Sequence, residues 1–157
     1  MQATRTQHAS RQLTMLNPLG LYDPSANGYS HVAMVAPGAG LVCVAGQGGE
    51  RADGSLPDSF EAQVRQAFDN LGVALAAAGA QLRHVAKLTV LVVDHDEARL
   101  AVLAAAVERA WGDAPKPVCT LIPVPRLALD GMLFEVEALA VAEGSTSAAS
   151  SASSGAV

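Results

Sequence analysis

The chain has 157 residues, of which half are apolar and 16% are charged, and its net charge is −5. This length suits one domain with a full core, and the low charged fraction indicates that another subunit buries part of the surface. The ten scattered lysines and arginines form no basic footprint for nucleic acid. No apolar run is long enough for a membrane span, and no cysteines or histidines have metal-ligand spacing, so neither a membrane nor a metal is predicted.

The two ends of the chain differ in composition from the middle. Residues 1–11 are polar and we expect a flexible N-terminus, while residues 144–157 form a Ser/Ala/Gly tail that we expect to be disordered. A single domain is predicted over residues 12–143. The N-terminal residues lack the apolar core of a signal peptide. Cys43 and Cys119 both fall in strand-like text, so reduced thiols and a cytoplasmic location are expected.

The first predicted elements are strands, followed by a helix. The runs "YSHVAMVA" and "GLVCVAGQ", joined by "PGAG", predict a hairpin, and a short strand near Leu13–Leu16 could precede it. Residues 57–80 then change to helical spacing, with Asp58 and Glu61 as the start signal and Gly79 as the stop signal. The apolar stripe of this helix consists of Phe60, Val64, Phe68, Leu71 and Leu75.

The second half of the chain alternates strand and helix. The run "HVAKLTVLVVD" predicts a strand in which Ala86 shares a face with Leu88, while Lys87 and Thr89 face the other way. A second helix is expected to begin at Asp94, with Glu97 as its capping partner, and to end at Gly112 and Pro115. Two strands follow, over Val118–Val124 and Met132–Val141.

The predicted order is β-β-α-β-α-β-β, which indicates an α/β (α+β) fold with both helices on one face of a mixed sheet. Successive residues of the last strand point to two faces that differ in composition. One face consists of Phe134, Val136, Ala138 and Ala140, and the other of Leu133, Glu135, Glu137 and Leu139. Carboxylates on a partly apolar face are costly unless they meet partners or water, which favours a cleft at a subunit interface.

Four segments together resemble the Rid family, the YjgF-like reactive intermediate deaminases. They are "ANGYSHVAMV", "LVCVAGQGG", "QVRQAFDNLGVALAAAGAQLRHVAKLTVLVVD" and "RLALDGMLFEVEALAV", and the resemblance runs from about Asn17 to Val141. It implies a chorismate-mutase-like fold, a homotrimer with clefts between subunits, and hydrolysis of reactive enamines or imines to ketones and ammonia. It implies no cofactor. Older descriptions of the family read endoribonuclease or translation inhibitor.

The resemblance also implies a set of site residues. Tyr29 matches the cleft tyrosine of the family, and Glu135 matches the carboxylate that holds the attacking water. Gly46 and Gln47 match a Gly-Gln pair, although the serine often found before them is Ala45 here.

The arginine that clamps the substrate carboxylate in the family has no counterpart in this chain. Its position falls on Cys119, or on Pro117 if the register is moved by two residues. A thiol is one weak donor without charge, so amino-acid imines are expected to be poor substrates. Either Arg126 supplies the missing charge, or the substrate lacks a carboxylate at that end.

Several roles stay open at this stage. Cys119 could be a nucleophile, a pocket wall or inert filler, and Thr120 could offer a hydroxyl to a ligand or only suit a strand. Cys43 is interpreted as filler, and His31 as structural. Glu137 is interpreted as structural, with Lys87 as its partner.

Three classes of function follow from these features. The favoured one is a hydrolase acting on C=N bonds, with a small enamine or imine as substrate. The second is a non-catalytic trimer that holds a small metabolite or a protein in the same cleft. The third, ribonuclease, is disfavoured by the acidic balance of the chain.

Overall fold

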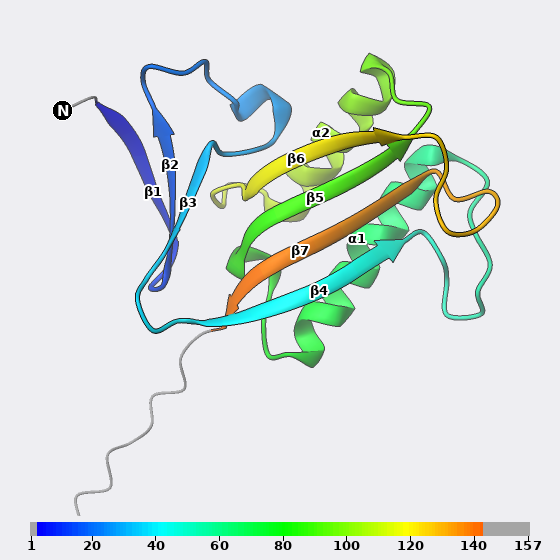
Figure 1. Cartoon of the computed structure of the whole chain (residues 1–157), viewed down its shortest axis with the longest axis horizontal. Helices are drawn as coiled ribbons and strands as arrows, with labels where there is room; N and C mark the ends of the chain where they lie inside the picture. Colours follow the sequence, from blue (N-terminus) through cyan, green and yellow to red (C-terminus); the bar gives the residue numbers. More distant parts are fainter. Residues whose placement is uncertain (1–2, 143–157) are drawn as a thin grey trace, which may run out of the picture.

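A computed structural model describes residues 3–142 of the chain (Figure 1). It contains two β-sheets, two α-helices and two short 3₁₀ helices, η1 and η2. The elements are β1 (Thr4–Ser10), β2 (Leu13–Pro18), η1 (Ser25–Asn27), β3 (Val32–Val35), β4 (Gly40–Gly48), α1 (Phe60–Ala77), η2 (Leu82–His84), β5 (Val85–Val93), α2 (Glu97–Trp111), β6 (Val118–Val124) and β7 (Phe134–Ala142).

The larger sheet has the strand order β4-β7-β5-β6 and is mixed, because β5 and β6 run parallel while the other pairs are antiparallel. Both α-helices lie on the same face of this sheet, as Figure 1 shows. Helix α1 packs on β4 and β7 and contacts α2. The predicted fold class, a mixed sheet with two helices on one face, is confirmed. Within residues 3–142 no α-helix covers the opposite face of the sheet, and we call it the open face.

The helix starts differ from the predicted ones by one or two residues. The hydroxyl of Ser59, and not Asp58, caps α1 by accepting a hydrogen bond from the Ala62 amide. Asp96 caps α2, while Asp94 adopts a left-handed backbone conformation (φ 47°) in the turn before it. Short polar side chains cluster at helix starts, so composition alone does not identify which of them is the cap.

The main core lies between the helices and the larger sheet. The predicted stripe of α1 is buried there, together with the alternate residues of β7 that begin at Phe134. The ring of Phe134 contacts the rings of Phe60 and Phe68, with centroids 6.0 and 6.1 Å away. Half of β7 therefore belongs to the core, as its alternation predicted.

The N-terminal part of the chain corrects two expectations. Residues 1–11 were expected to be flexible, but β1 forms there and pairs with β2. The hairpin expected between residues 29–36 and 40–47 does not form, because β3 pairs with β2 and β4 pairs with β7. Both errors have one cause, since the extra hairpin β1–β2 gives β3 a partner that local sequence patterns do not reveal.

A second, smaller core cluster consists of Leu13, Met15, Ala86 and Val141, and it joins the small sheet to the large one. Ala86 was expected to share a face with Leu88. The register of β5 against β7 shifts between Val85 and Lys87, so Val85 takes the place facing the helices and Ala86 points toward the small sheet.

No helix of the described part is long and apolar enough to cross a membrane. The tail predicted at residues 144–157 lies outside the described residues, as does the last residue of the predicted domain, at 143.

Candidate functional site

Glu135 lies on the open face of the larger sheet. Its neighbours Phe134 and Val136 both point into the main core, so strand alternation turns its carboxylate the other way, where it is half-buried. In the register of β5 with β7, Glu135 is paired with Leu91. The sheet itself therefore separates the Glu135 carboxylate from the main core.

Gly46 makes room for the Glu135 carboxylate. A Cβ at position 46 would overlap the Glu135 side chain, so only glycine fits there without displacing the carboxylate. The pairing of β4 with β7 is irregular between Val44 and Gln47. The Gln47 amide donates to the carbonyls of Ala45 and Gly46 at 3.1 and 3.2 Å and braces this irregularity. The predicted site residues Gly46, Gln47 and Glu135 are thus brought together.

A hollow of about 410 Å³ lies further along the open face. Lys87, Thr89 and Glu137 contribute its polar groups, and Cys43 and Leu139 line it as well. Cys43, interpreted as filler from the sequence, is exposed. Lys87 and Glu137 share the hollow, but they form no ion pair among residues 3–142.

Cys119 lies on the other side of the sheet. It pairs with Leu88 in the parallel register of β5 and β6, and like Leu88 it packs against the main core beneath the helices. It lines a half-open groove of about 310 Å³ between β6, α2 and the loop around η1. We call this cavity the β6–α2 groove. Thr120, the next residue, is exposed and turns to the open face.

The Cys119 thiol is protonated at neutral pH. Burial raises its pKa from 9.0 to about 11, and the charge of Lys87 offsets this only in part. A nucleophilic cysteine needs the opposite shift, toward the thiolate. The structure therefore favours the pocket-wall role over the nucleophile role.

Tyr29 lines the same β6–α2 groove as Cys119. Its position is set by Ser30, which is buried and forms a parallel bridge with Val118 at the start of β6. The Ser30 amide donates to the Pro117 carbonyl at 3.0 Å and its hydroxyl to the Lys116 carbonyl at 2.7 Å. This anchor brings the predicted residues Tyr29 and Cys119 into one cavity.

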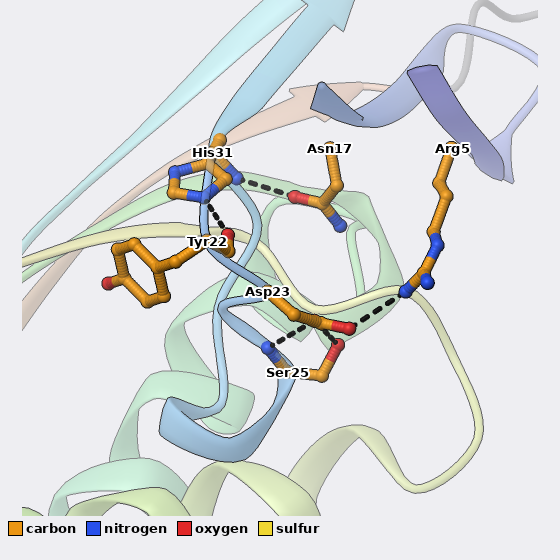
Figure 2. A network of polar contacts seen from close by, with 6 residues as sticks. All are labelled: Arg5, Asn17, Tyr22, Asp23, Ser25 and His31. Carbon is orange, nitrogen blue, oxygen red and sulfur yellow. Dashed lines mark hydrogen bonds and ion pairs between the residues drawn. The ribbon is translucent and has the colours of Figure 1, made fainter. Parts of the chain in front are cut away.

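An aromatic cluster supports Tyr29. Its ring meets those of Tyr22 and His31 edge to face, with centroids 6.4 and 5.5 Å away, and the two tyrosine hydroxyls are hydrogen-bonded. Figure 2 shows how His31 is fixed: its amide donates to Asn17 Oδ1 at 2.9 Å, and its ring Nε2 lies 2.8 Å from the Tyr22 carbonyl oxygen. These contacts give His31 a structural role, as interpreted from the sequence.

Asp23 secures the start of this loop. It accepts hydrogen bonds from the amide and hydroxyl of Ser25 at 3.0 and 2.6 Å and forms an ion pair with Arg5 at 2.7 Å (Figure 2). These partners, Ser25 foremost, lower the pKa of Asp23 to about 2. Arg5 belongs to β1, so the N-terminal strand helps to position the loop that carries Tyr29.

Arg126 does not reach Cys119 within one chain. It forms an ion pair with Asp130 at 3.2 Å in the loop after β6, while Cys119 is the second residue of that strand. Seven residues of extended chain span roughly 20 Å. Of the two alternatives that the sequence left open, these contacts of Arg126 within its own subunit favour a substrate without a carboxylate near Cys119.

Gln63 positions the segment that leads to Glu135, and sequence reasoning missed it. Its side chain is 1% exposed. The amide donates to the carbonyls of Pro57 and Gly131 at 3.0 and 2.8 Å, and its oxygen accepts from the Leu133 amide at 2.8 Å. A glutamine inside the apolar stripe of α1 was the signal that could have found it.

The site residues thus form two groups on opposite faces of one sheet. Glu135, Gly46 and Gln47 lie on the open face, and Tyr29 and Cys119 lie in the β6–α2 groove. Residues 3–142 contain no group of three or more His, Cys, Asp or Glu side chains that could hold a metal ion.

Comparison with known proteins identifies the family. Residues 22–142 match the family described as Endoribonuclease L-PSP. The RutC family protein YjgH of Escherichia coli is 35% identical over 100 residues, which cover 64% of this chain and 74% of that protein.

Solved structures agree with this match. The Rid family protein YyfB of Yersinia pestis has a TM-score of 0.79 at 31% identity, covering 83% of this chain and 99% of that one. The YjgF gene product of E. coli has a TM-score of 0.60 at 28% identity, covering 69% and 85%. The chain therefore belongs to the Endoribonuclease L-PSP family, the family of the Rid and YjgF-like proteins.

Proposed function

We propose that the protein hydrolyses a reactive enamine or imine to a carbonyl compound and ammonia, with Glu135 holding the attacking water. The observation that carries this proposal is the half-buried Glu135 carboxylate on the open face, for which Gly46 leaves room. Membership of the Rid family supports it, because the family resemblance assigns the water-holding role to this residue.

The reaction asks little of the protein. The carbon of a C=N bond is already electrophilic, so a positioned water adds to it while a base takes the water's proton. Glu135 is that base in our proposal. The nitrogen gains a proton, the C–N bond of the resulting carbinolamine breaks, and the carbonyl compound and ammonia leave. Tyr29 is the proposed donor for the departing nitrogen.

Tyr29 and Glu135 lie on opposite faces of the sheet, so in this proposal a second copy of the chain completes the site. The open face supports such an assembly, because it exposes Leu41, Ile122 and Leu139, which are 65%, 41% and 43% accessible. Exposed apolar side chains gathered on one face are typical of association surfaces. We infer a homotrimer whose clefts join the open face of one copy to the β6–α2 groove of the next.

We infer that the substrate has no carboxylate near Cys119. The family resemblance puts the position of the missing arginine at Cys119 or at Pro117, and neither side chain offers a charge to a carboxylate, since the Cys119 thiol keeps its proton at neutral pH. Losing an arginine–carboxylate contact in a desolvated site costs about 2–5 kcal/mol, roughly 30- to 1000-fold or more. Imines derived from amines, not from amino acids, fit such a site better.

The test compares two sources of imine. An amino-acid oxidase generates imines with a carboxylate, an amine oxidase generates imines without one, and ammonia release is followed with each. We expect the wild type to accelerate hydrolysis only in the second case, and Cys119→Arg to extend it to the first. Glu135→Gln should lower the rate with the imine from the amine oxidase at least about 100-fold.

Glu137→Gln is the matched control, since Glu137 lies two residues further along the same strand and face. It should retain activity. If neither the wild type nor any variant accelerates ammonia release from either source above the spontaneous rate, while the wild type still binds an imine analogue, the protein is a non-catalytic binding trimer and the deaminase proposal is wrong.

A further inference from the structure

His95 belongs to the β6–α2 groove, although nothing in the sequence indicated it. It lies in the turn between β5 and α2, between the left-handed Asp94 and the helix cap Asp96. It lines the groove together with Tyr29 and Cys119. A polar ring in the wall of a ligand-sized cavity is a candidate for fixing ligand orientation.

The His95 ring has one nitrogen that meets no partner. Nδ1 is buried and finds no hydrogen-bond partner among residues 3–142. A proton on this atom would be a buried donor left without a partner, which is costly. Of the two tautomers of a neutral imidazole, the one that carries its proton on Nε2 avoids this cost. The Nε2–H of that tautomer is the donor left for a ligand.

The remaining walls of the groove are uncharged. The hydroxyls of Tyr22 and Tyr29 bond to each other, Cys119 keeps its proton, and the other walls are the Asn27 amide and three leucines, Leu100, Leu103 and Leu121. No lysine or arginine lines this groove, so a carboxylate that enters it would lose part of its water without gaining such a partner.

His95 and Cys119 lie at different positions along β5. Cys119 pairs with Leu88 in the first half of that strand, Leu121 pairs with Val90, and His95 follows the end of the strand at Val93. All three residues line the groove. A molecule that contacts both His95 and Cys119 must therefore be extended, with an apolar middle part beside Leu121.

We propose that His95 is a specificity-determining residue that donates its Nε2–H to an uncharged oxygen at the far end of an extended, mostly apolar ligand. The groove thereby selects neutral carbonyl compounds or their imines over carboxylates. The inference rests on the proposed function for the reaction, and it is tested by binding alone.

The experiment uses 2-heptanone and heptanoate, which share an extended carbon chain and differ in charge, titrated into the full chain and followed by NMR. We expect the wild type to bind 2-heptanone at least about tenfold more tightly than heptanoate. His95→Leu should weaken 2-heptanone binding about 3- to 10-fold, as expected for one neutral hydrogen bond, and leave heptanoate unchanged. His95→Gln keeps a side-chain N–H and should restore most of the affinity.

Two results would overturn the inference. One is unchanged 2-heptanone affinity in His95→Leu, with the fold confirmed by its amide spectrum. The other is tighter binding of heptanoate that depends on His95, which would make the ring a cation. A ¹⁵N spectrum of histidine-labelled wild type tests the tautomer without any variant: a proton on Nδ1 contradicts the proposal.

These outcomes separate the inference from the proposed reaction. Binding of 2-heptanone that depends on His95, without imine hydrolysis, would leave the inference standing and the deaminase function rejected. Hydrolysis of neutral imines in which His95→Leu does not change ligand preference would do the reverse.

Discussion

The two faces of strand β7 differ in what they do for the protein. On the covered face Phe134, Val136 and Ala138 are 0%, 0% and 3% exposed, whereas on the open face Leu139 is 43% exposed and Glu137 is exposed beside it. One strand thus supplies core packing and a surface for chemistry from alternate residues. A substitution on the covered face of β7 should therefore change stability, whereas a substitution at the next position, on the open face, should change assembly or activity.

The largest effect is expected when one large side chain on each face of β7 is truncated and the losses of stability are compared. Phe134→Ala removes a ring packed between Phe60 and Phe68 and should lower the free energy of unfolding by about 3–5 kcal/mol. Leu139→Ala, its counterpart on the open face, should cost less than about 1 kcal/mol in a dissociated chain but weaken self-association. Urea unfolding and sedimentation measure the two effects, and equal losses of stability would show that the faces do not differ as described.

A smaller effect is expected at Gly46, on the open face. Gly46→Ala places a methyl group against the carboxylate end of Glu135, which can rotate away, so the change should displace the carboxylate and destabilise the chain by only about 1 kcal/mol. Gly72→Ala is the control, because an added Cβ in α1 meets nothing within 4 Å and should stabilise the helix by up to about 1 kcal/mol.

Combining Gly46→Ala with Glu135→Ala removes the overlap, so the double variant should recover the cost of the first change. Additive losses in urea unfolding would mean that Glu135 is not what requires glycine at position 46.

The smallest effect concerns Cys119, beneath the helices. Its pKa is raised to about 11 in the folded chain, so the folded state keeps a proton that the unfolded chain releases above pH 9. The corresponding stability is present below pH 9 and is lost as the pH rises toward 11, about 1 kcal/mol of it by pH 10. Urea midpoints of the wild type and Cys119→Ala at pH 8, 9 and 10 isolate this contribution. If the difference in urea midpoint between the two proteins does not change with pH, the thiol is exposed to water and its pKa is not raised.

The sequence predicted what depends on local periodicity and failed where distant pairing decides. The alternation of β7 and the stripe of α1 are properties of neighbouring residues, and both were confirmed. That β3 pairs with β2 and not with β4 depends on a hairpin whose outer strand is polar and carries no strong pattern. Likewise, the pairing of Cys119 with Leu88, which turns it away from Glu135, follows from a parallel register that no short motif encodes.

The groove around His95 shows the same limit. Its walls come from the η1 loop, α2 and β6, so no window of sequence contains it. Gln63 differs, since a glutamine in an apolar stripe is visible in the sequence and could have been flagged as a buried polar group with several partners.

The pairing of β4 with β7 has a consequence for how the chain folds during synthesis. The register joins Gly40 to Ala142, so the backbone of β4 cannot form its hydrogen bonds in the larger sheet until β7, the last strand, has been synthesised. Closing so long a loop makes this contact slow. Until β7 leaves the ribosome, β4 and β5 have no strand between them, and helix α1 has only part of its sheet to pack on. The nascent chain therefore completes its larger sheet in a single late step and exposes unpaired strand edges until then.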